Sequence, residues 1–371
     1  MSKGAIYSSL NLTMRKESHW QEGEMTVRSR SESAQPIKTP LSATGSQYNP
    51  FTVFYRVVGG DEPSWLQDLE LMHHYTIYTS NTLSNQESLL AIWRDEFPRL
   101  AVSHNFLMHG LLALSALHLA HLRPAARHTY YMISSHHQNL AIGTFRTVLP
   151  QITRDNASAF FALSAILSLF TFATGADSNR PVLQMGDVAE CFQLVRGVRG
   201  ILNSSWEWVS EGPLSPLLHV ETPTPTTKLS GEFAERVQTL GGLIASQSYP
   251  EDIASTLTQS IEKLMRTFAV LAANADMRGK PDLEGWMFPC VLPLGFHGLL
   301  LQPHPAALLI VAYYCVLQKP CEEVWFMNGW SDRVMVTLEH AMDPEWKCHL
   351  EWPKSKVADR WNAVATENRA A

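Results

Sequence analysis

The stretch FLMHGLLALSALHLAHL, from Phe106 to Leu122, decides the fold of this chain. Leucines recur along it at helical spacing, and further apolar residues cover its remaining faces. A helix that is apolar nearly all round lies at the centre of a protein or in a membrane. The histidines in this stretch argue against a bilayer, so we expect the central helix of a helical domain, which ends before Pro124.

The residues on both sides of this stretch also predict helices. From Trp65 to Phe172 the apolar residues fall at helical spacing, while the alternation typical of strands is scarce. One helix is expected from Glu87 to Phe97, because a proline such as Pro98 disfavours helical backbone in the residue before it. Together the predicted helices form an antiparallel array, and the expected fold class is all-α, a multi-helix bundle.

Composition divides the chain into five parts. The first part is rich in Ser, Pro, Thr and Gln with little to bury, which predicts a disordered lead-in. A segment rich in Pro and Thr predicts a linker between two helical parts of one domain. The expected boundaries are 1–64 for the lead-in, 65–211 and 232–353 for the helical parts, 212–231 for the linker and 354–371 for a polar tail.

Charge argues against unaided binding to nucleic acid. The 371 residues carry 29 Lys and Arg against 35 Asp and Glu, a net charge of −6, with no basic footprint for phosphates. We therefore expect no direct contact between this chain and nucleic acid. The N-terminus shows no apolar stretch typical of a secretory signal, which predicts a cytoplasmic and nuclear location.

Metal and cofactor motifs are not found in the sequence. The five cysteines are widely spaced among apolar residues and form no C-x-x-C pair, which is typical of reduced core thiols. Nine of the 15 histidines lie between His73 and His137, but no H-E-x-x-H motif is among them. Phosphate-binding glycine motifs and the G-x-S-x-G elbow are also missing, so we predict no metal and no cofactor.

Two uncharged segments raise the question of a membrane span. Residues 156–176 are diluted by serine and threonine, and residues 285–318 are interrupted by prolines. Neither leaves a continuous apolar run of the length that a bilayer requires. We expect buried helices and no membrane span.

Aromatic residues gather near the end of the chain, where Trp325, Phe326, Trp330, Trp346 and Trp352 fall within 28 positions. Amphipathic aromatics at this density serve core packing, or a surface for a ligand or a second subunit. A large helical domain with this excess of apolar side chains is also expected to enclose an apolar cavity, the usual site of a hydrophobic ligand.

Several stretches resemble one family. DLELMHHYT, HNFLMHGLLALSALHLA, HHQNLAIGTFRTVLPQI and NASAFFALSAILSLFTFA are followed near the end by HPAALLIVAYY, VWFMNGW and PEWKCHLEWP. In this order they resemble the C-terminal regulatory domain of fungal zinc-binuclear-cluster (Zn2Cys6) transcription factors, in particular the sterol uptake control proteins. The similarity covers roughly residues 69–353.

The resemblance implies an all-α regulatory domain that forms a homodimer and holds a sterol or another lipid-like metabolite in a hydrophobic pocket. Binding of this small molecule would control entry into the nucleus and gene expression. By the same resemblance, the candidate pocket wall is formed by residues of two helices and closed by the VWFMNGW stretch. These residues are Leu107, Met108, Leu111, Phe160, Leu163, Leu167, Trp325, Phe326 and Trp330.

One departure from the family pattern concerns the zinc cluster. Family members carry six cysteines in C-x-x-C pairs that hold two zinc ions and dock a helix in the major groove, whereas the first cysteine here is Cys191. An upstream exon missing from this sequence, a fingerless regulator that acts through a partner, and a helical domain reused for another task would each explain this. A reused domain would bind a hydrophobic secondary metabolite or transform it as a cofactor-free isomerase or cyclase. Beside the regulator and the reused domain, a third possible function is that of a pure dimerisation module.

Overall fold

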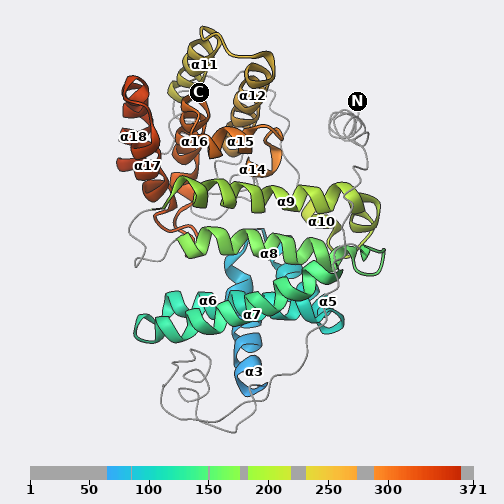
Figure 1. The fold of residues 1–371 in the computed structure, drawn as a ribbon. Helices are drawn as coiled ribbons and strands as arrows, with labels where there is room; N and C mark the ends of the chain where they lie inside the picture. The colour runs from blue at the N-terminus through green and yellow to red at the C-terminus, as the bar shows by residue number, and fades with distance from the viewer. Residues whose placement is uncertain are drawn as a thin grey trace, which may run out of the picture. The chain divides into compact units, whose positions relative to one another are not determined.

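A computed structural model describes residues 65–84, 86–148, 151–175, 183–218, 231–273 and 288–360. All regular elements in these residues are helices, which confirms the all-α fold class (Figure 1). Up to residue 218 they are α3 (Trp65–His74), η1 (Tyr75–Thr79), η2 (Ser80–Thr82), α4 (Glu87–Ala91), η3 (Ile92–Glu96), α5 (Phe97–Ser103), α6 (Asn105–Leu122), η4 (Pro124–Ala126), α7 (Arg127–Val148), α8 (Ala157–Gly175), α9 (Met185–Ser210) and α10 (Ser215–Leu218). From residue 231 they are α11 (Glu232–Ala245), α12 (Glu251–Ala273), α14 (Phe288–Val291), α15 (Phe296–Leu301), α16 (Pro305–Gln318), η6 (Lys319–Cys321), α17 (Trp330–Ala341), η7 (Pro344–Leu350) and α18 (Glu351–Ala358).

Helix α6 occupies the centre of the first group of helices. It pairs with α7 in a helical hairpin and also packs against α5, α8 and η1 (Figure 1). Its residues from Gly110 to Ala120 are buried without exception. By length and composition α6 is apolar enough to cross a membrane, yet 72 % of it is buried inside the fold, as in the core helix of a water-soluble protein.

Helix α9 packs against helices of both predicted helical parts. One side of it packs along α8, and it also contacts α14, α15 and α17 (Figure 1). At Ser205 the backbone leaves helical geometry (φ −135°, ψ 18°), where the Ser205 hydroxyl donates to the Ile201 carbonyl at 2.6 Å. Such back-bonding by serine is a common cause of a helix bend. Buried residues from both parts form one continuous core.

Helix α16 plays the same central part in the second group. Every residue from Ala306 to Gln318 is buried, because α12, α15, α17 and α18 pack around it. Pro305 occupies its first turn, where the missing N–H is not needed. The uncharged segment 305–318 is therefore a core helix, as the sequence predicted.

The prediction that a helix stops before Pro98 is wrong. Instead η3 ends at Glu96 in π-helical geometry, and Pro98 lies in the first turn of α5, which continues to Ser103. A proline in a first turn removes no helical hydrogen bond. After the π-helical turn η3, with its i→i+5 hydrogen bonds, a new α-helix begins at Phe97.

Only some of the predicted domain boundaries lie within the residues that the structure describes. The lead-in 1–64 lies outside the described residues, as do residues 219–230 of the linker and 361–371 of the tail. Within the linker range the structure places a helical turn, α10, and within the tail range it places the end of α18 at Ala358. The division into five parts stays a prediction.

Candidate ligand-binding site

Most residues of the predicted pocket wall lie at the contact between α6 and α8. Leu107 and Leu111 of α6 and Phe160 and Leu163 of α8 are fully buried. The helices approach closely at Gly110, where a Cβ atom would lie 2.6 Å from Leu163 Cδ1. Glycine at this position allows the close approach. We call these five residues the α6–α8 seam.

The remaining two wall residues lie at the edge of the same region. Met108 and Leu167 are half-buried and pack against the core. Phe106 and Phe145 add aromatic contacts with Phe160, each with ring centroids 5.1 Å apart. The helices thus bring the six predicted wall residues of α6 and α8 into one region, and their role in holding a ligand stays a prediction.

Trp325 lies at the other end of α6, against a buried histidine. Its indole stacks on the His118 imidazole, with centroids 4.8 Å apart and planes inclined by 21°. The indole N–H donates to Thr82 Oγ1 at 2.9 Å, and His118 Nδ1 is 3.0 Å from Thr79 Oγ1. Phe326 packs edge-on against Trp325 with centroids 5.5 Å apart. The segment before α17 is thereby attached to α6 and η2.

Trp330 lies apart from Trp325, at the first residue of α17. Its ring meets Phe172 of α8 at 5.5 Å and Tyr314 of α16 at 5.8 Å between centroids, both edge-on. The segment 324–330, called the aromatic block below, therefore contacts α6 through Trp325, and α8 and α16 through Trp330. The nine predicted residues occupy three neighbouring places.

A charge network flanks the aromatic block, with Lys319 and Glu322 buried and Asp332 half exposed. Lys319 lies 2.9 Å (Nζ to Oε2) from Glu322, and Lys319 also pairs with Asp332. The second oxygen of Glu322 accepts the backbone N–H of Ser331, at the start of α17. Burial lowers the pKa of Lys319, but its hydrogen bonds to Asp332 and Glu322 outweigh this and raise it overall. The lysine therefore stays charged, and the network joins the end of α16 to the start of α17.

The histidines near Trp325 are neutral at physiological pH. Burial lowers the pKa of His118 to about 3, with help from the neighbouring His74 and His121. Burial also lowers the pKa of His74 and of His121. Neutral imidazoles beside an indole offer flat, weakly polar surfaces and hydrogen bonds. They carry no charge that would have to lose its hydration when an apolar ligand covers it.

A second histidine pair links α3, α6 and α7. His109 Nδ1 and His137 Nδ1 are 3.0 Å apart, and His137 Nε2 lies 3.4 Å from Asp68 Oδ1. Burial lowers the pKa of His137 to about 4 and raises that of Asp68. Over the described ranges no group of three or more His, Cys, Asp or Glu is arranged to hold a metal ion.

The buried cysteines are chemically quiet. Burial raises the pKa of the Cys191 thiol to about 12 and raises those of Cys290 and Cys315. The Cys290 thiol donates to the Val195 carbonyl at 2.8 Å. A protonated, buried thiol is a poor nucleophile and a poor metal ligand.

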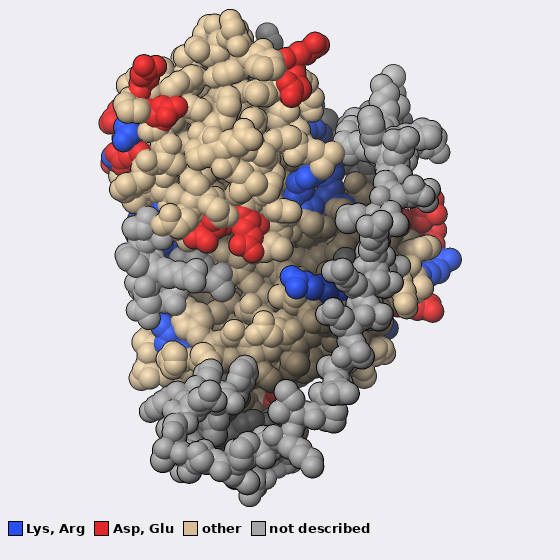
Figure 2. Space-filling view, in the orientation of Figure 1, with Lys and Arg blue, Asp and Glu red and all other residues tan. Residues whose placement is uncertain are grey.

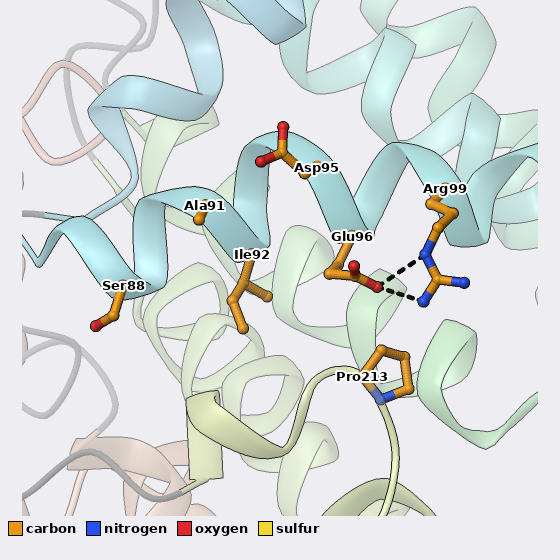
Figure 3. Close-up of a pocket in the computed structure, with 7 residues that line it drawn as sticks. All are labelled: Ser88, Ala91, Ile92, Asp95, Glu96, Arg99 and Pro213. Atoms are coloured by element: carbon orange, nitrogen blue, oxygen red, sulfur yellow. Dashed lines mark hydrogen bonds and ion pairs between the residues drawn. The ribbon is translucent and has the colours of Figure 1, made fainter.

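A surface groove of about 400 Å³ lies elsewhere, along η3 (Figure 3). Ala91, Ile92 and Pro213 are its apolar lining residues, and Glu96 and Arg99, which also line it, form an ion pair with Arg99 Nε 2.9 Å from Glu96 Oε2. No motif in the sequence predicts this groove, because Pro213 comes from the predicted linker and its position beside η3 follows from the fold alone. On the face shown in Figure 2, acidic and basic side chains are scattered in small groups over an otherwise uncharged surface.

The part of the chain that contains the α6–α8 seam matches a known family of domains. Residues 70–201, which include η1 to α8 and most of α9, match the fungal specific transcription factor domain. Over these residues the chain is similar to the regulatory domain of fungal transcription factors. This confirms the resemblance found in the sequence.

Similar proteins extend the match beyond residue 201. A Zn(2)-C6 fungal-type transcription factor of Gibberella zeae is 25 % identical over 318 residues, which cover 79 % of this chain and 62 % of that protein. Sterol uptake control protein 2 of Saccharomyces cerevisiae is 27 % identical over 277 residues, 71 % of this chain and 29 % of the relative. The protein of the same name from Candida albicans is 27 % identical over 289 residues, 73 % and 40 % of the two chains. The chain thus spans between about a third and two thirds of these relatives.

Proposed function

We propose that this regulatory domain senses a hydrophobic, sterol-like ligand and converts its binding into a change in gene expression. The observation that carries the proposal is the aromatic block. Trp325 is held by α6 and η2 while Trp330 packs between α8 and α16. A ligand that inserts between either tryptophan and the helices it packs against would shift the aromatic block relative to both groups of helices.

The chemistry around the block suits an apolar ligand. The α6–α8 seam is lined with aliphatic and aromatic side chains, and the histidines at Trp325 are neutral because their pKa values are lowered. A ligand can shift a conformational equilibrium only by its difference in affinity for the two states. In this proposal the two states are the block docked at its two places of contact, as in the structure, and the block displaced from them.

Similarity to the two sterol uptake control proteins supports the choice of a sterol-like molecule over other apolar ligands, since each aligns with more than two thirds of this chain. In this proposal the protein acts in the nucleus, in keeping with relatives that are transcription factors. It reaches DNA through a zinc cluster in another segment or through a partner protein. The homodimer and a cytoplasmic pool belong to the same proposal.

A reporter assay tests this function. The full chain is fused to a heterologous DNA-binding domain in yeast, and reporter expression is measured with and without an inhibitor of sterol synthesis. We expect a severalfold change in expression on sterol depletion. Trp325→Ala, which removes the contact with His118 and Thr82, should abolish the response, whereas Trp346→Ala, in η7, should retain it. A reporter that ignores sterol supply in the unmodified fusion would contradict the sensor function.

A further inference from the structure

Two polar side chains on one face of α16 are fully buried without a hydrogen-bond partner. The Tyr314 hydroxyl and both the amide nitrogen and the amide oxygen of Gln318 make no hydrogen bond, and both residues are 0 % exposed. Residues separated by four positions in a helix lie side by side on its surface. Because nearly all buried polar groups in proteins are paired, this concentration of three unpaired atoms requires an explanation.

Aromatic rings from three other helices surround Tyr314. Its ring centroid lies 4.7 Å from Phe288 of α14, 5.8 Å from Trp330 of α17 and 6.0 Å from Phe192 of α9. Figure 1 shows α16 on the same side of α9 as α14 and α17. Trp330 belongs to the aromatic block and to the predicted pocket, so the ring of Tyr314 lies directly beside the proposed sensing element.

The Cys290 thiol and the Ser331 hydroxyl, on α14 and α17, have hydrogen-bond partners of their own. The Cys290 thiol donates to the Val195 carbonyl at 2.8 Å, and the Ser331 hydroxyl donates to the Cys315 carbonyl at 3.1 Å. Neither bonds to Tyr314 or Gln318. Tyr314 thus carries an unpaired hydroxyl on a ring that lies among aromatic rings, and Gln318, one helical turn further along α16, adds an unpaired, buried amide N–H₂ and amide oxygen.

We propose that Gln318 and Tyr314 form the polar anchor for the hydroxyl group of an apolar alcohol bound between α9, α14, α16 and α17. A hydroxyl donates one hydrogen bond and accepts others, so it can donate to Gln318 Oε1 while accepting from Gln318 Nε2 or from Tyr314. The aromatic rings would contact the apolar body of the molecule. This inference rests on the proposed function and specifies the chemical group by which the ligand is recognised.

Full burial of the anchor couples binding to a conformational change. A ligand can reach Gln318 only if packed side chains move, and the next residue, Lys319, belongs to the charge network that holds the aromatic block. Opening at Gln318 therefore acts directly beside the Lys319 end of that network. The ligand then binds the opened arrangement better than the closed one, as a sensor requires.

The test compares two probes and two variants of the full chain. Dehydroergosterol, a fluorescent sterol alcohol, and its 3-methyl ether are titrated while energy transfer from tryptophan is measured. The unmodified chain should bind the alcohol more tightly. Gln318→Met and Tyr314→Phe should weaken binding of the alcohol by about tenfold and leave binding of the ether nearly unchanged.

Thermal unfolding without sterol gives a second, independent readout. Both variants remove unpaired buried polar atoms with little change of shape, so each should raise Tm by about 2–4 °C. Tyr313→Phe is the matched control, because this neighbouring tyrosine packs on Trp352 with centroids 5.1 Å apart, away from the anchor. It should bind both probes as the unmodified chain does.

Each outcome bears on the proposal. Equal binding of alcohol and ether by the unmodified chain, or unchanged affinity in both variants, would overturn the anchor while the sensor function stands. A lowered Tm together with unchanged affinity would indicate that a buried water serves Gln318. If the unmodified chain binds neither probe, the sterol-sensing function falls, and the anchor with it.

Discussion

His118 is 5 % exposed beneath Trp325, and burial lowers the pKa of its imidazole to about 3. In the unfolded chain the same group titrates near pH 6.5. Between these two values the folded state binds fewer protons than the unfolded state, so the free energy of unfolding falls as the pH falls below about 6.5. The slope for one such group is up to about 1.4 kcal/mol per pH unit.

A single substitution tests this pH dependence. His118→Phe keeps a ring against Trp325 but cannot titrate, so the difference in unfolding free energy between pH 7 and pH 5.5 should shrink by about 1 kcal/mol. At pH 7 the variant should be less stable by about 1 kcal/mol, because Thr79 Oγ1 loses its partner. Urea unfolding at both pH values measures the difference, and His128→Phe, at an exposed position of α7, serves as the control. An unaltered pH dependence in His118→Phe would contradict the neutral, buried state.

For single residues, the sequence predicts which side chains are buried better than it predicts which side chains they contact. His118 lies on the apolar helix that the sequence predicts to be central, and it is buried there with a bond to Thr79. The contact between Trp325 and Thr82 joins residues 243 positions apart, and no local pattern encodes it. Gln318 closes a long uncharged run in the sequence, yet only the packed structure reveals that its amide has no partner.

Gly110 sets the distance between the elements α6 and α8. A Cβ atom there would lie 2.6 Å from Leu163 Cδ1, a side chain that is itself fully buried. Gly→Ala in a helix interior ordinarily stabilises by about 0.5–1 kcal/mol, but overpacking a core typically destabilises by about 1–3 kcal/mol. We therefore expect Gly110→Ala to lower the free energy of unfolding.

A matched variant and a double substitution isolate this steric effect. Gly143 of α7 has open space around it, so Gly143→Ala should be stabilising by about 0.5–1 kcal/mol. Because Leu163→Ala removes the clashing methyl group, Gly110→Ala should be less harmful in that background than in the unmodified chain. Chemical unfolding of the unmodified chain, the three single variants and the double variant measures these differences in stability. Strict additivity of the two substitutions would show that α6 and α8 do not touch at Gly110.

Whole elements are read from the sequence where their pattern is long. The apolar run of α6 predicts a central helix, and the same holds for the uncharged run of α16, which is buried from Ala306 to Gln318. The prediction failed at Pro98, because a proline is excluded from a helix interior but not from a first turn, and the π-helical turn before α5 leaves no sequence signature.

At the scale of the whole molecule, the two groups of helices share one core. Buried residues from α6 through α18 are in continuous contact, and the Lys319–Glu322–Asp332 network holds the aromatic block that touches both groups. Such shared packing favours a single cooperative unfolding transition. Tryptophan fluorescence and far-ultraviolet circular dichroism should therefore give the same midpoint in urea.

Glu322→Gln tests whether this network stabilises the molecule as a unit. The Glu322 side chain is 7 % exposed, and the substitution leaves Lys319 buried with Asp332 as its remaining charged partner. Breaking a buried ion pair in this way should lower the free energy of unfolding by about 3 kcal/mol, with both spectroscopic midpoints moving together. Glu339→Gln removes the half-exposed pair with Lys354 and should change stability by less than about 1 kcal/mol. If the fluorescence midpoint alone moved in Glu322→Gln, the aromatic block would unfold separately, and a ligand bound there could not act on both groups of helices.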